Sequence, residues 1–461
     1  MQIKKGLLLF HYGCKVNQYE TNAMAQEFIQ KGYDVVDFNN TADVYIVNTC
    51  TVTNIADRKS RQMLRRVKEN NSNSIVVACG CYAQVGKAEL EKIEEIDLII
   101  GNNEKKDIVD IIENYIINNS SKLNCNNDCI DENKNLSNTI ITDVMKQKDY
   151  VEFGTTTYTE KTRAVVKIQD GCDRFCSYCI IPYARGRVRS RKMENVINEV
   201  EQIVEKGIKE VVITGIHIAS YGKDFKENIG LIDLLENLNK IEGLHRIRLG
   251  SIEPTIVTEE FVNRLSKLDK ICDHFHLSLQ SGCDETLKRM NRRYTTGDFE
   301  IVTKLLRNKF PNASLTTDII VGFPGETEAE FKQTYEFLRK ISFYKMHVFK
   351  YSQRKGTKAA VMPNQIDGSI KEQRSRKLIE LSDMNEKKYN SEYVGKKVEV
   401  LFEEKDGEFY KGHTKNYIMV LAKGEGLENE LVDVIVTGVG ENCLNSRIKK
   451  NVGCKNYNFV I

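Results

Sequence analysis

The sequence predicts an α/β protein in three parts: a doubly wound N-terminal domain, a central partial (β/α)6 barrel and a small all-β C-terminal barrel. Three observations carry this prediction. At 461 residues the chain is too long for one compact core. Short apolar runs alternate with helix-period segments over most of its length. Near the C-terminus, short alternating strands separated by glycine-containing turns replace this pattern.

Residues 1–116 predict a parallel sheet with helices on both faces, because strand-like runs and helical segments take turns along the chain. The expected strands are Leu7–Phe10, Val44–Val47, Ile75–Ala78 and Ile96–Ile100, and the expected helices are Tyr19–Gln30, Ile55–Asn70 and Gly86–Glu94. A sheet of this kind binds ligands just beyond the carboxyl ends of its strands.

Residues 117–157 are expected to form a linker, because the stretch from Asn118 to Asn138 is rich in asparagine and has no apolar period. A second alternation over residues 158–388 predicts about six βα units, with the chemistry at the carboxyl ends of the strands. The expected strands there are Ala164–Ile168, Glu210–Thr214, Arg246–Leu249, His274–Leu279, Ser314–Val321 and Lys345–Tyr351.

In residues 391–457 apolar and polar residues alternate with a period of two, as in β-strands. The expected strands are Lys397–Phe402, Tyr417–Leu421 and Leu431–Val436. They predict a small β-barrel of the kind that often binds nucleic acid. A β-domain that only packs against its neighbour fits the pattern nearly as well.

The composition is that of an ordinary globular protein, with 41% hydrophobic and 29% charged residues. No stretch approaches the roughly 18 uninterrupted apolar residues that a membrane helix needs. The apolar run after Gly6 is also shorter than the core of a secretory signal. We therefore expect a cytoplasmic protein without a membrane partner. Because 68 basic and 65 acidic residues nearly cancel, any nucleic-acid surface must come from local clustering.

The 13 cysteines favour metal–thiolate chemistry over disulfides, because the chain is long and carries no secretory signal. Cys172, Cys176 and Cys179, called here the radical cysteines, directly follow the first expected strand of the second alternation. Three thiolates at a strand end can hold a [4Fe–4S] cluster and leave one iron open for a small ligand. The alternative is zinc, which normally takes four closed ligands in paired C-x2-C spacings, and no second pair follows nearby.

Cys14, Cys50 and Cys81 form a second set, called here the auxiliary cysteines. Each lies just past an expected strand of the first region, so the fold would bring the three together. The alternative is three unrelated buried cysteines, the usual reading of any single cysteine. Cys79 competes with Cys81 for the third place, and spacing alone leaves both open.

Several motifs resemble known ones. The C-x3-C-x2-C spacing of the radical cysteines resembles the signature of the radical-SAM superfamily. The methylthiotransferase family has motifs similar to Tyr12–Gln18, Val47–Thr53, Gly80–Gln84, Ser278–Gly282, Lys288–Tyr294 and Gly322–Thr327. Its third N-terminal motif, Gly-Cys-x-Ala-Gln, selects Cys81 over Cys79. The C-terminal barrel is similar to the family's RNA-binding TRAM domain, so the resemblance covers nearly the whole chain outside the asparagine-rich stretch.

The resemblance implies two [4Fe–4S] clusters, one on each set of cysteines, together with S-adenosylmethionine (SAM). One SAM would methylate a sulfur on the auxiliary cluster. A second SAM, bound by the radical cysteines, would give the radical that removes hydrogen from C2 of an adenine. That hydrogen is not acidic, so a general base cannot remove it. The implied partners are the anticodon loop of tRNA, an electron donor such as flavodoxin or ferredoxin, and a sulfur source.

The substrate branch is suggested by Thr214–Gly222, which resembles the branch that methylthiolates N6-threonylcarbamoyladenosine at position 37 of tRNA. This implication rests on analogy. The alternatives are the isopentenyladenosine branch, which typically has Gly-Gln-Asn there, and the branch that modifies a ribosomal-protein aspartate. The basic run Arg185–Lys192 could be a solvated charged face, but beside this site we expect it to bind RNA phosphates.

Other residues remain unassigned. No catalytic residue is predicted, and Glu253, Gln280 and Asp318 could contact the cofactor or be ordinary residues of the barrel rim. The remaining cysteines are expected to be incidental: Cys125, Cys129, Cys272, Cys283, Cys443 and Cys454.

Overall fold

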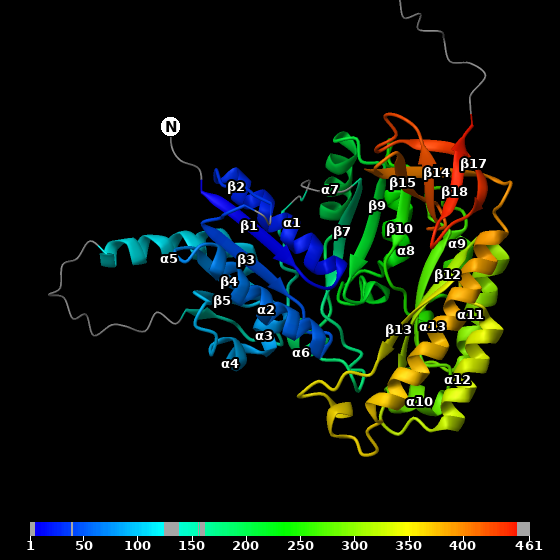
Figure 1. Ribbon diagram of the computed structural model, residues 1–461, viewed down its shortest axis with the longest axis horizontal. Helices are drawn as coiled ribbons and strands as arrows, with labels where there is room; N and C mark the ends of the chain where they lie inside the picture. The colour runs from blue at the N-terminus through cyan, green and yellow to red at the C-terminus, as the bar shows by residue number, and fades with distance from the viewer. Residues whose placement is uncertain (1–4, 38–39, 124–137, 155, 157–161, 450–461) are drawn as a thin grey trace, which may run out of the picture.

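The computed structural model describes residues 5–37, 40–123, 138–154, 156 and 162–449. It contains the three expected units, and the C-terminal barrel sits against the central one (Figure 1). Among the described residues, none of the helices is both long and apolar enough to cross a membrane.

The N-terminal domain is a six-stranded parallel sheet in the order β2-β1-β3-β4-β5-β6. Its strands are β1 (Gly6–His11), β2 (Asp34–Val35), β3 (Val44–Thr49), β4 (Ile75–Gly80), β5 (Leu98–Ile100) and β6 (Thr139–Ile140). Its helical elements are α1 (Lys15–Gln30), α2 (Asn54–Asn70), α3 (Cys81–Val85), α4 (Lys87–Leu90), the 3-10 turn η1 (Glu104–Asp107) and α5 (Ile108–Leu123).

This sheet is doubly wound, as its sequence pattern predicts. One face carries a core that includes Phe28 of α1 and Ile112 of α5, whereas the core on the other face includes Leu64 of α2 and Tyr82 of α3. The end of helix α5 and the whole of strand β6 lie within the stretch expected as a linker, and β6 pairs with β5. Residues 124–137, with Cys125 and Cys129, lie outside the described residues.

The central domain is an open barrel. Strands β7, β9 and β10 form one parallel group, and β11, β12 and β13 form another. Two single bridges, Ile247 with Ile271 and Ile252 with Leu277, join the groups. The short strand β8 runs antiparallel to β7. The strands are β7 (Arg163–Asp170), β8 (Arg189–Ser190), β9 (Glu210–Gly215), β10 (Arg246–Leu249), β11 (His274–Gln280), β12 (Ser314–Val321) and β13 (Lys345–Lys350).

The helical elements of this domain alternate with its strands along the chain. They are α6 (Ile181–Arg185), α7 (Met193–Glu205), α8 (Leu231–Leu238), α9 (Glu259–Leu265), α10 (Asp284–Arg289), α11 (Thr296–Lys309), α12 (Glu328–Ile341) and α13 (Gly368–Ser391), with 3-10 turns η2 (Ile218–Ser220), η3 (Pro254–Ile256) and η4 (Lys358–Val361). Capping residues in the local sequence determine where several of these helices begin. At α12 the Thr327 hydroxyl accepts from the Glu330 amide (3.2 Å) and the Glu330 carboxylate accepts from the Thr327 amide (2.8 Å), a capping box.

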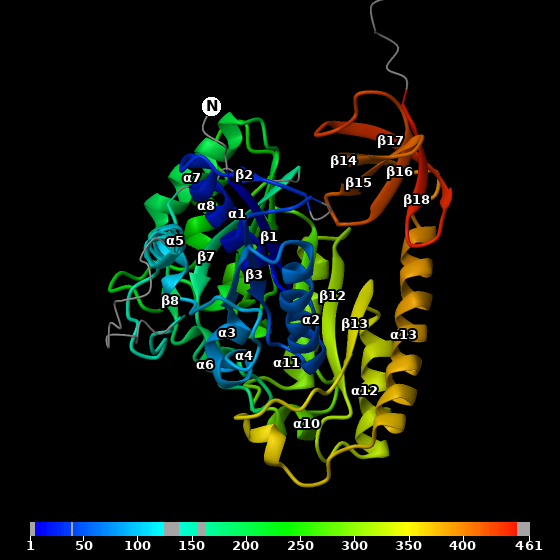
Figure 2. The ribbon, with the colours of Figure 1, turned by 60° about the vertical axis from the view of Figure 1, so that its left-hand side comes forward.

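The C-terminal unit is a closed five-stranded barrel in the order β14-β15-β16-β18-β17. Its strands are β14 (Lys397–Asp406), β15 (Phe409–Thr414), β16 (Met419–Lys423), β17 (Leu431–Val439) and β18 (Leu444–Ile448). Helix α13 leads into it along the side of the central domain (Figure 2). The C-terminal barrel contacts the first residues of the central strands. Arg246 of β10 donates to the His413 carbonyl (2.9 Å), and Ser314 of β12 donates to the Asn416 carbonyl (2.6 Å).

Candidate active site

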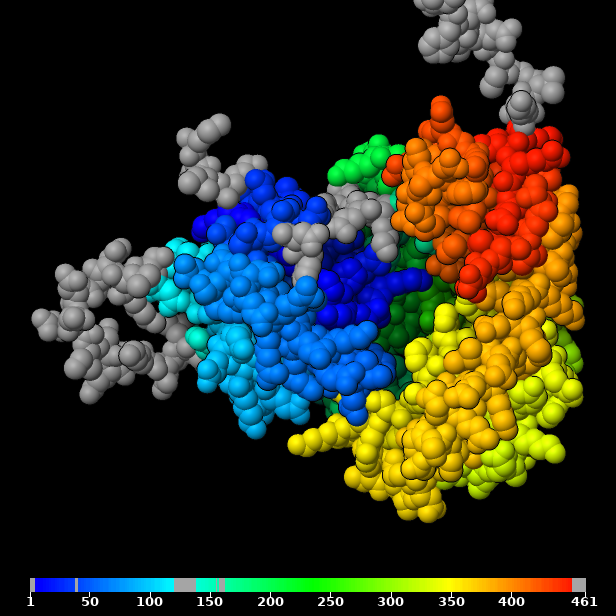
Figure 3. All heavy atoms as spheres, viewed as in Figure 1, coloured from blue at the N-terminus to red at the C-terminus, as the bar shows by residue number. Residues whose placement is uncertain are grey.

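A cavity of about 880 Å³ lies where the three units meet. In the space-filling view a hollow opens between the N-terminal domain, the central domain and the C-terminal barrel (Figure 3). Cys14 and all three radical cysteines line the cavity, and so do His413 and Tyr417 of the C-terminal barrel. This volume falls in the range of roughly 300–1,000 Å³ that is usual for small-molecule and cofactor sites.

The loop of the radical cysteines begins at a position that only glycine can occupy. Gly171 follows β7 with a φ of +71°, and a Cβ there would lie 1.7 Å from the carbonyl oxygen of Arg187. The Cys172 amide then donates to the Gly186 carbonyl (3.0 Å), which closes the loop on itself. The three sulfurs are therefore presented at the carboxyl end of β7, as expected.

A buried carboxylate organises the charges beside this loop. Arg292 donates to the sulfur of Cys176 (3.3 Å) and its guanidinium lies 3.5 Å from Glu253, which also pairs with Arg174. The Nε2 of His217 lies 3.2 Å from the same carboxylate. Burial opposes ionisation of Glu253, but His217 and the two guanidiniums outweigh it and lower its pKa to about 2. Glu253 therefore holds two arginines at the cavity wall.

The auxiliary cysteines come together from three strand ends. Cys14 caps the N-terminus of α1, and a Cβ on the preceding Gly13 (φ +96°) would lie 2.5 Å from the sulfur of Cys50. Cys50 is in turn within electrostatic range of both Cys81 and Cys14. Burial raises the pKa of the Cys50 thiol to about 12, so a thiolate there needs a bound cation or metal ion. Cys14 is exposed toward the cavity, whereas Cys50 and Cys81 lie behind it.

Cys81, rather than Cys79, stands with Cys14 and Cys50. Cys79 is fully buried in the apolar core, and burial raises its pKa to about 12. Cys81 begins α3 and its sulfur has two polar neighbours: the Nε of Arg185 at 3.1 Å and the side-chain amide of Asn102 at 3.8 Å.

The expectation that the basic run binds RNA phosphates is wrong for three of its arginines. Arg185, Arg189 and Arg191 are each at most 1% exposed. Their charges are taken up inside the protein: Arg189 lies 3.7 Å from Asp170, and Arg191 pairs with Glu199. The alternating pattern that resembled a solvated stripe instead belongs to a strand and turn packed between two domains.

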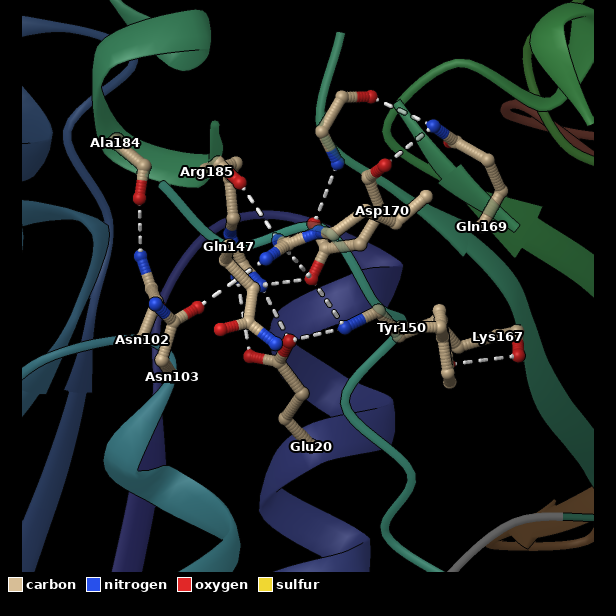
Figure 4. Close-up of polar contacts among 12 residues, drawn as sticks. Glu20, Asn102, Asn103, Gln147, Tyr150, Lys167, Gln169, Asp170, Ala184 and Arg185 are labelled. Atoms are coloured by element: carbon tan, nitrogen blue, oxygen red, sulfur yellow. Dashed lines mark hydrogen bonds and ion pairs between the residues drawn. The ribbon is translucent and has the colours of Figure 1, made fainter. Parts of the chain in front are cut away.

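Arg185 belongs to a buried ionic cluster that joins these domains (Figure 4). Glu20 of α1 accepts from Lys105 of η1 (2.6 Å), from Lys167 of β7 (2.7 Å) and from Arg185 of α6 (3.1 Å). Asp170 accepts from Lys167 at 2.6 Å and lies 3.4 Å from Arg185. Despite burial, Arg185, Lys105 and Lys167 hold the pKa of Glu20 well below its usual range. The sequence offered no signal for this cluster, because its members lie up to 165 residues apart.

Three further polar residues converge on the cavity from adjacent strands. The Nε2 of His276 (β11) lies 3.2 Å from a carboxylate oxygen of Asp318 (β12), and His347 (β13) completes a group whose ligand atoms lie within 4.8 Å of one another. Two histidines and a carboxylate are a set that can hold a divalent transition-metal ion. Gln280, at the end of β11, also lines the cavity.

Comparison with known proteins agrees with this architecture. The profile of the radical SAM superfamily matches residues 166–338, and that of the uncharacterized protein family UPF0004 matches residues 7–101. The radical SAM methyltransferase TsrM of Kitasatospora setae shares the fold, with a TM-score of 0.53, 15% identity and coverage of 75% of this chain and 73% of that one.

Several curated relatives extend along nearly the whole chain. The threonylcarbamoyladenosine tRNA methylthiotransferases MtaB of Bacillus subtilis and Aquifex aeolicus are 41% and 39% identical, covering 94% and 92% of this chain and 94% and 98% of theirs. The tRNA-2-methylthio-N(6)-dimethylallyladenosine synthase of Moorella thermoacetica is 33% identical over 95% of this chain and 97% of its own. From the two cysteine sets, the shared fold and these relatives together, the chain belongs to the family of radical-SAM methylthiotransferases.

Proposed function

We propose that this protein methylthiolates C2 of N6-threonylcarbamoyladenosine at position 37 of tRNA. One observation carries the proposal: a single cavity is lined by all three radical cysteines and by Cys14 of the auxiliary set. Sulfur insertion at an unactivated carbon needs a radical generator and a sulfur donor that reach the same atom. The threonylcarbamoyladenosine branch is favoured because the relatives of that name are 37–41% identical, against 33–35% for the dimethylallyladenosine enzymes.

The donor sets fit two [4Fe–4S] clusters. Within the described part of the chain each set offers three thiol ligands, which leaves one iron open for SAM at the radical cysteines or for sulfur at the auxiliary cysteines. When bound, the two clusters and SAM supply a 5′-deoxyadenosyl radical and the sulfur and methyl group to be transferred. The six proposed ligands are Cys14, Cys50, Cys81, Cys172, Cys176 and Cys179.

Charged side chains of the protein contact the sulfurs of two of these ligands. Arg292 donates to the sulfur of Cys176, and Arg185 donates to that of Cys81. Cys14 lies at the N-terminus of α1, but burial raises the pKa of its thiol, so a thiolate there needs a bound metal ion. Hydrogen bonds to ligand sulfurs also tune the reduction potential of an iron–sulfur site.

The proposed reaction also defines the remaining partners. Radical generation needs a one-electron donor, for which we propose flavodoxin or ferredoxin, and each turnover consumes a sulfur atom that a separate source must restore. We assign contacts with the anticodon arm to the C-terminal barrel, which resembles a TRAM domain. Because the proposed substrate is tRNA, we place the reaction in the cytoplasm.

The test is direct. The anaerobically reconstituted, reduced protein is incubated with SAM and anticodon stem-loops that carry either threonylcarbamoyladenosine or isopentenyladenosine, and the digested nucleosides are identified by mass spectrometry. We expect product only on the first substrate, with discrimination on the order of 10⁴-fold. Product on the isopentenyl substrate alone refutes the branch, and no product on either RNA refutes the proposal. Nucleosides of tRNA from a strain lacking the gene provide an independent check.

A further inference from the structure

One end of the cavity is a cationic pocket between the N-terminal domain and the C-terminal barrel. Lys15, His274, His413 and Tyr417 line it and are called here the Lys15 pocket. Lys15 is the first residue of α1, directly after Cys14. The ring of Tyr417 stacks on His274 (centroids 4.8 Å apart, planes at 18°) and on His413 (4.5 Å, 17°). This stacking holds the three rings in place on one wall of the pocket.

The charge of Lys15 is not compensated by the protein. Its side chain is exposed toward the cavity, and among the described residues no carboxylate forms an ion pair with it. Burial lowers the pKa of Lys15, and Arg163, Arg248 and the carboxylate of Glu210 lie within electrostatic range of it. Each of these arginines has an acidic partner, Glu403 at 2.9 Å and Glu210 at 2.7 Å respectively. The pocket therefore keeps an unmatched positive charge beside an auxiliary cysteine.

The His276 side of the cavity wall has no such surplus, whereas beside the radical cysteines Arg174 and Arg292 share the single carboxylate of Glu253. The acidic residues of the cavity wall among the described part of the chain are Glu253, Asp318 and Glu386, and each has a basic partner. Glu386, for example, lies 3.0 Å from Lys345. An anionic group that enters this cavity is thus attracted to the Lys15 pocket rather than to the His276 side.

A second observation points to a ligand at the same place. His274 is only 7% exposed, and its Nε2 lies 3.0 Å from the hydroxyl of Thr316. Its Nδ1 is buried and has no hydrogen-bond partner among the described residues. A buried ring nitrogen without a partner costs free energy, and a polar ligand that reached it would recover that cost.

We propose that the Lys15 pocket binds the carboxylate of the substrate's N6 side chain, an inference that rests on the proposed function. Adenine C2 and the exocyclic N6 lie on the same edge of the base. When C2 faces the sulfur site at Cys14, the N6 side chain runs along the wall toward the next residue, Lys15. The ureido and hydroxyl groups of that side chain can satisfy His274 in either tautomer. An isopentenyl group leaves both residues unpaired, so the pocket selects against it.

Binding measurements test this pocket without depending on turnover. Anaerobic anisotropy titrations use a stem-loop bearing threonylcarbamoyladenosine and the same RNA with the carboxylate converted to a methyl ester. We expect the wild-type protein to bind the ester about 10- to 100-fold more weakly than the acid. Lys15→Met should bind the acid as weakly as the wild type binds the ester, with no further loss on the ester. Lys15→Arg should retain most of the acid preference.

Controls separate the pocket from the clusters and from the function. Lys92→Met changes an exposed lysine of the N-terminal domain and should behave as wild type. Iron content of Lys15→Met should be unchanged. Equal losses on acid and ester RNA would show that Lys15 holds a backbone phosphate and would overturn the proposal, as would equal wild-type binding of the two RNAs. If the wild type prefers isopentenyladenosine RNA, the proposed function itself fails. If its preference for threonylcarbamoyladenosine survives in Lys15→Met, only the pocket fails.

Discussion

Replacing Glu20 by glutamine should destabilise the junction of the N-terminal and central domains. The substitution keeps the shape of the side chain but removes the carboxylate that accepts from Lys105, Lys167 and Arg185. Lys167 and Arg185 keep Asp170 as a partner. Lys105 is 0% exposed, and Glu20 is its only ion-pair partner among the described residues. The main effect is therefore one buried cation left without a counter-charge.

The magnitude follows from that single loss. Removing one partner of a buried pair costs about 3–5 kcal/mol. At roughly 2–4 °C per kcal/mol for a cooperative unit of 150–250 residues, Tm should fall by about 6–20 °C. The double variant Glu20→Gln/Lys105→Met should recover part of the loss, because the stranded charge is gone. The change in the free energy of unfolding of the double variant should therefore differ from the sum of the two single changes by at least about 1 kcal/mol.

The assay is urea unfolding of the four proteins of this double-mutant cycle at pH 7.5 under anaerobic conditions. A loss below about 1 kcal/mol for Glu20→Gln, or strictly additive effects, would refute the reasoning. The pH dependence has a definite sign. Since the pKa of Glu20 is lowered by folding, its stabilisation is complete above the ordinary carboxyl pKa of about 4.3 and is lost as pH falls through the lowered folded value.

Three further predictions concern the site. Cys176→Ala should abolish SAM cleavage and reduce iron from about eight to about four atoms per chain, and continued formation of 5′-deoxyadenosine would contradict the assignment. Cys81→Ala should lose the auxiliary iron whereas Cys79→Ala keeps it, and iron analysis showing the reverse would exchange their roles. Folding lowers the pKa of Glu253 to about 2, so in the cluster-free protein the stability difference between wild type and Glu253→Gln should shrink as pH falls from about 4.5 toward 2. A difference independent of pH in urea unfolding would exclude this role.

Periodicity and strand-end positions predicted much of the fold. The expected strand Ser314–Val321 coincides with β12, and Val44–Val47 lies within β3. Both are parallel strands rich in β-branched and apolar residues, and the apolar run Val44–Val47 and the run Ile319–Val321 are visible directly in the sequence. Cys14 and Cys50 could be grouped for the same reason, since the carboxyl ends of neighbouring parallel strands share one edge.

What the sequence did not reveal depends on pairings between distant segments. Arg185 and Arg189 have the composition of a phosphate-binding surface, and only the positions of Glu20 and Asp170 show that they are buried counter-ions. The identity of a charged residue does not show whether its side chain is exposed to water or paired with a buried carboxylate. The sequence also cannot show that Lys15 lacks an acidic partner, because this depends on the positions of all neighbouring carboxylates in the fold.

Helix α13 behaves as a rigid spacer. Its 24 residues span about 36 Å. Leu378 and Leu381 pack into the core of the central domain, while Tyr389 at the far end packs against the core of the C-terminal barrel. Adding or removing one residue would turn the barrel by about 100° and shift it by about 1.5 Å, away from its seat on Arg246. Even a seven-residue insertion, which nearly restores the orientation, would displace it by about 10 Å. The distance between the surface of the C-terminal barrel and the cavity is therefore fixed by the length of α13. A change in that length requires compensating changes in the packing at both ends of the helix.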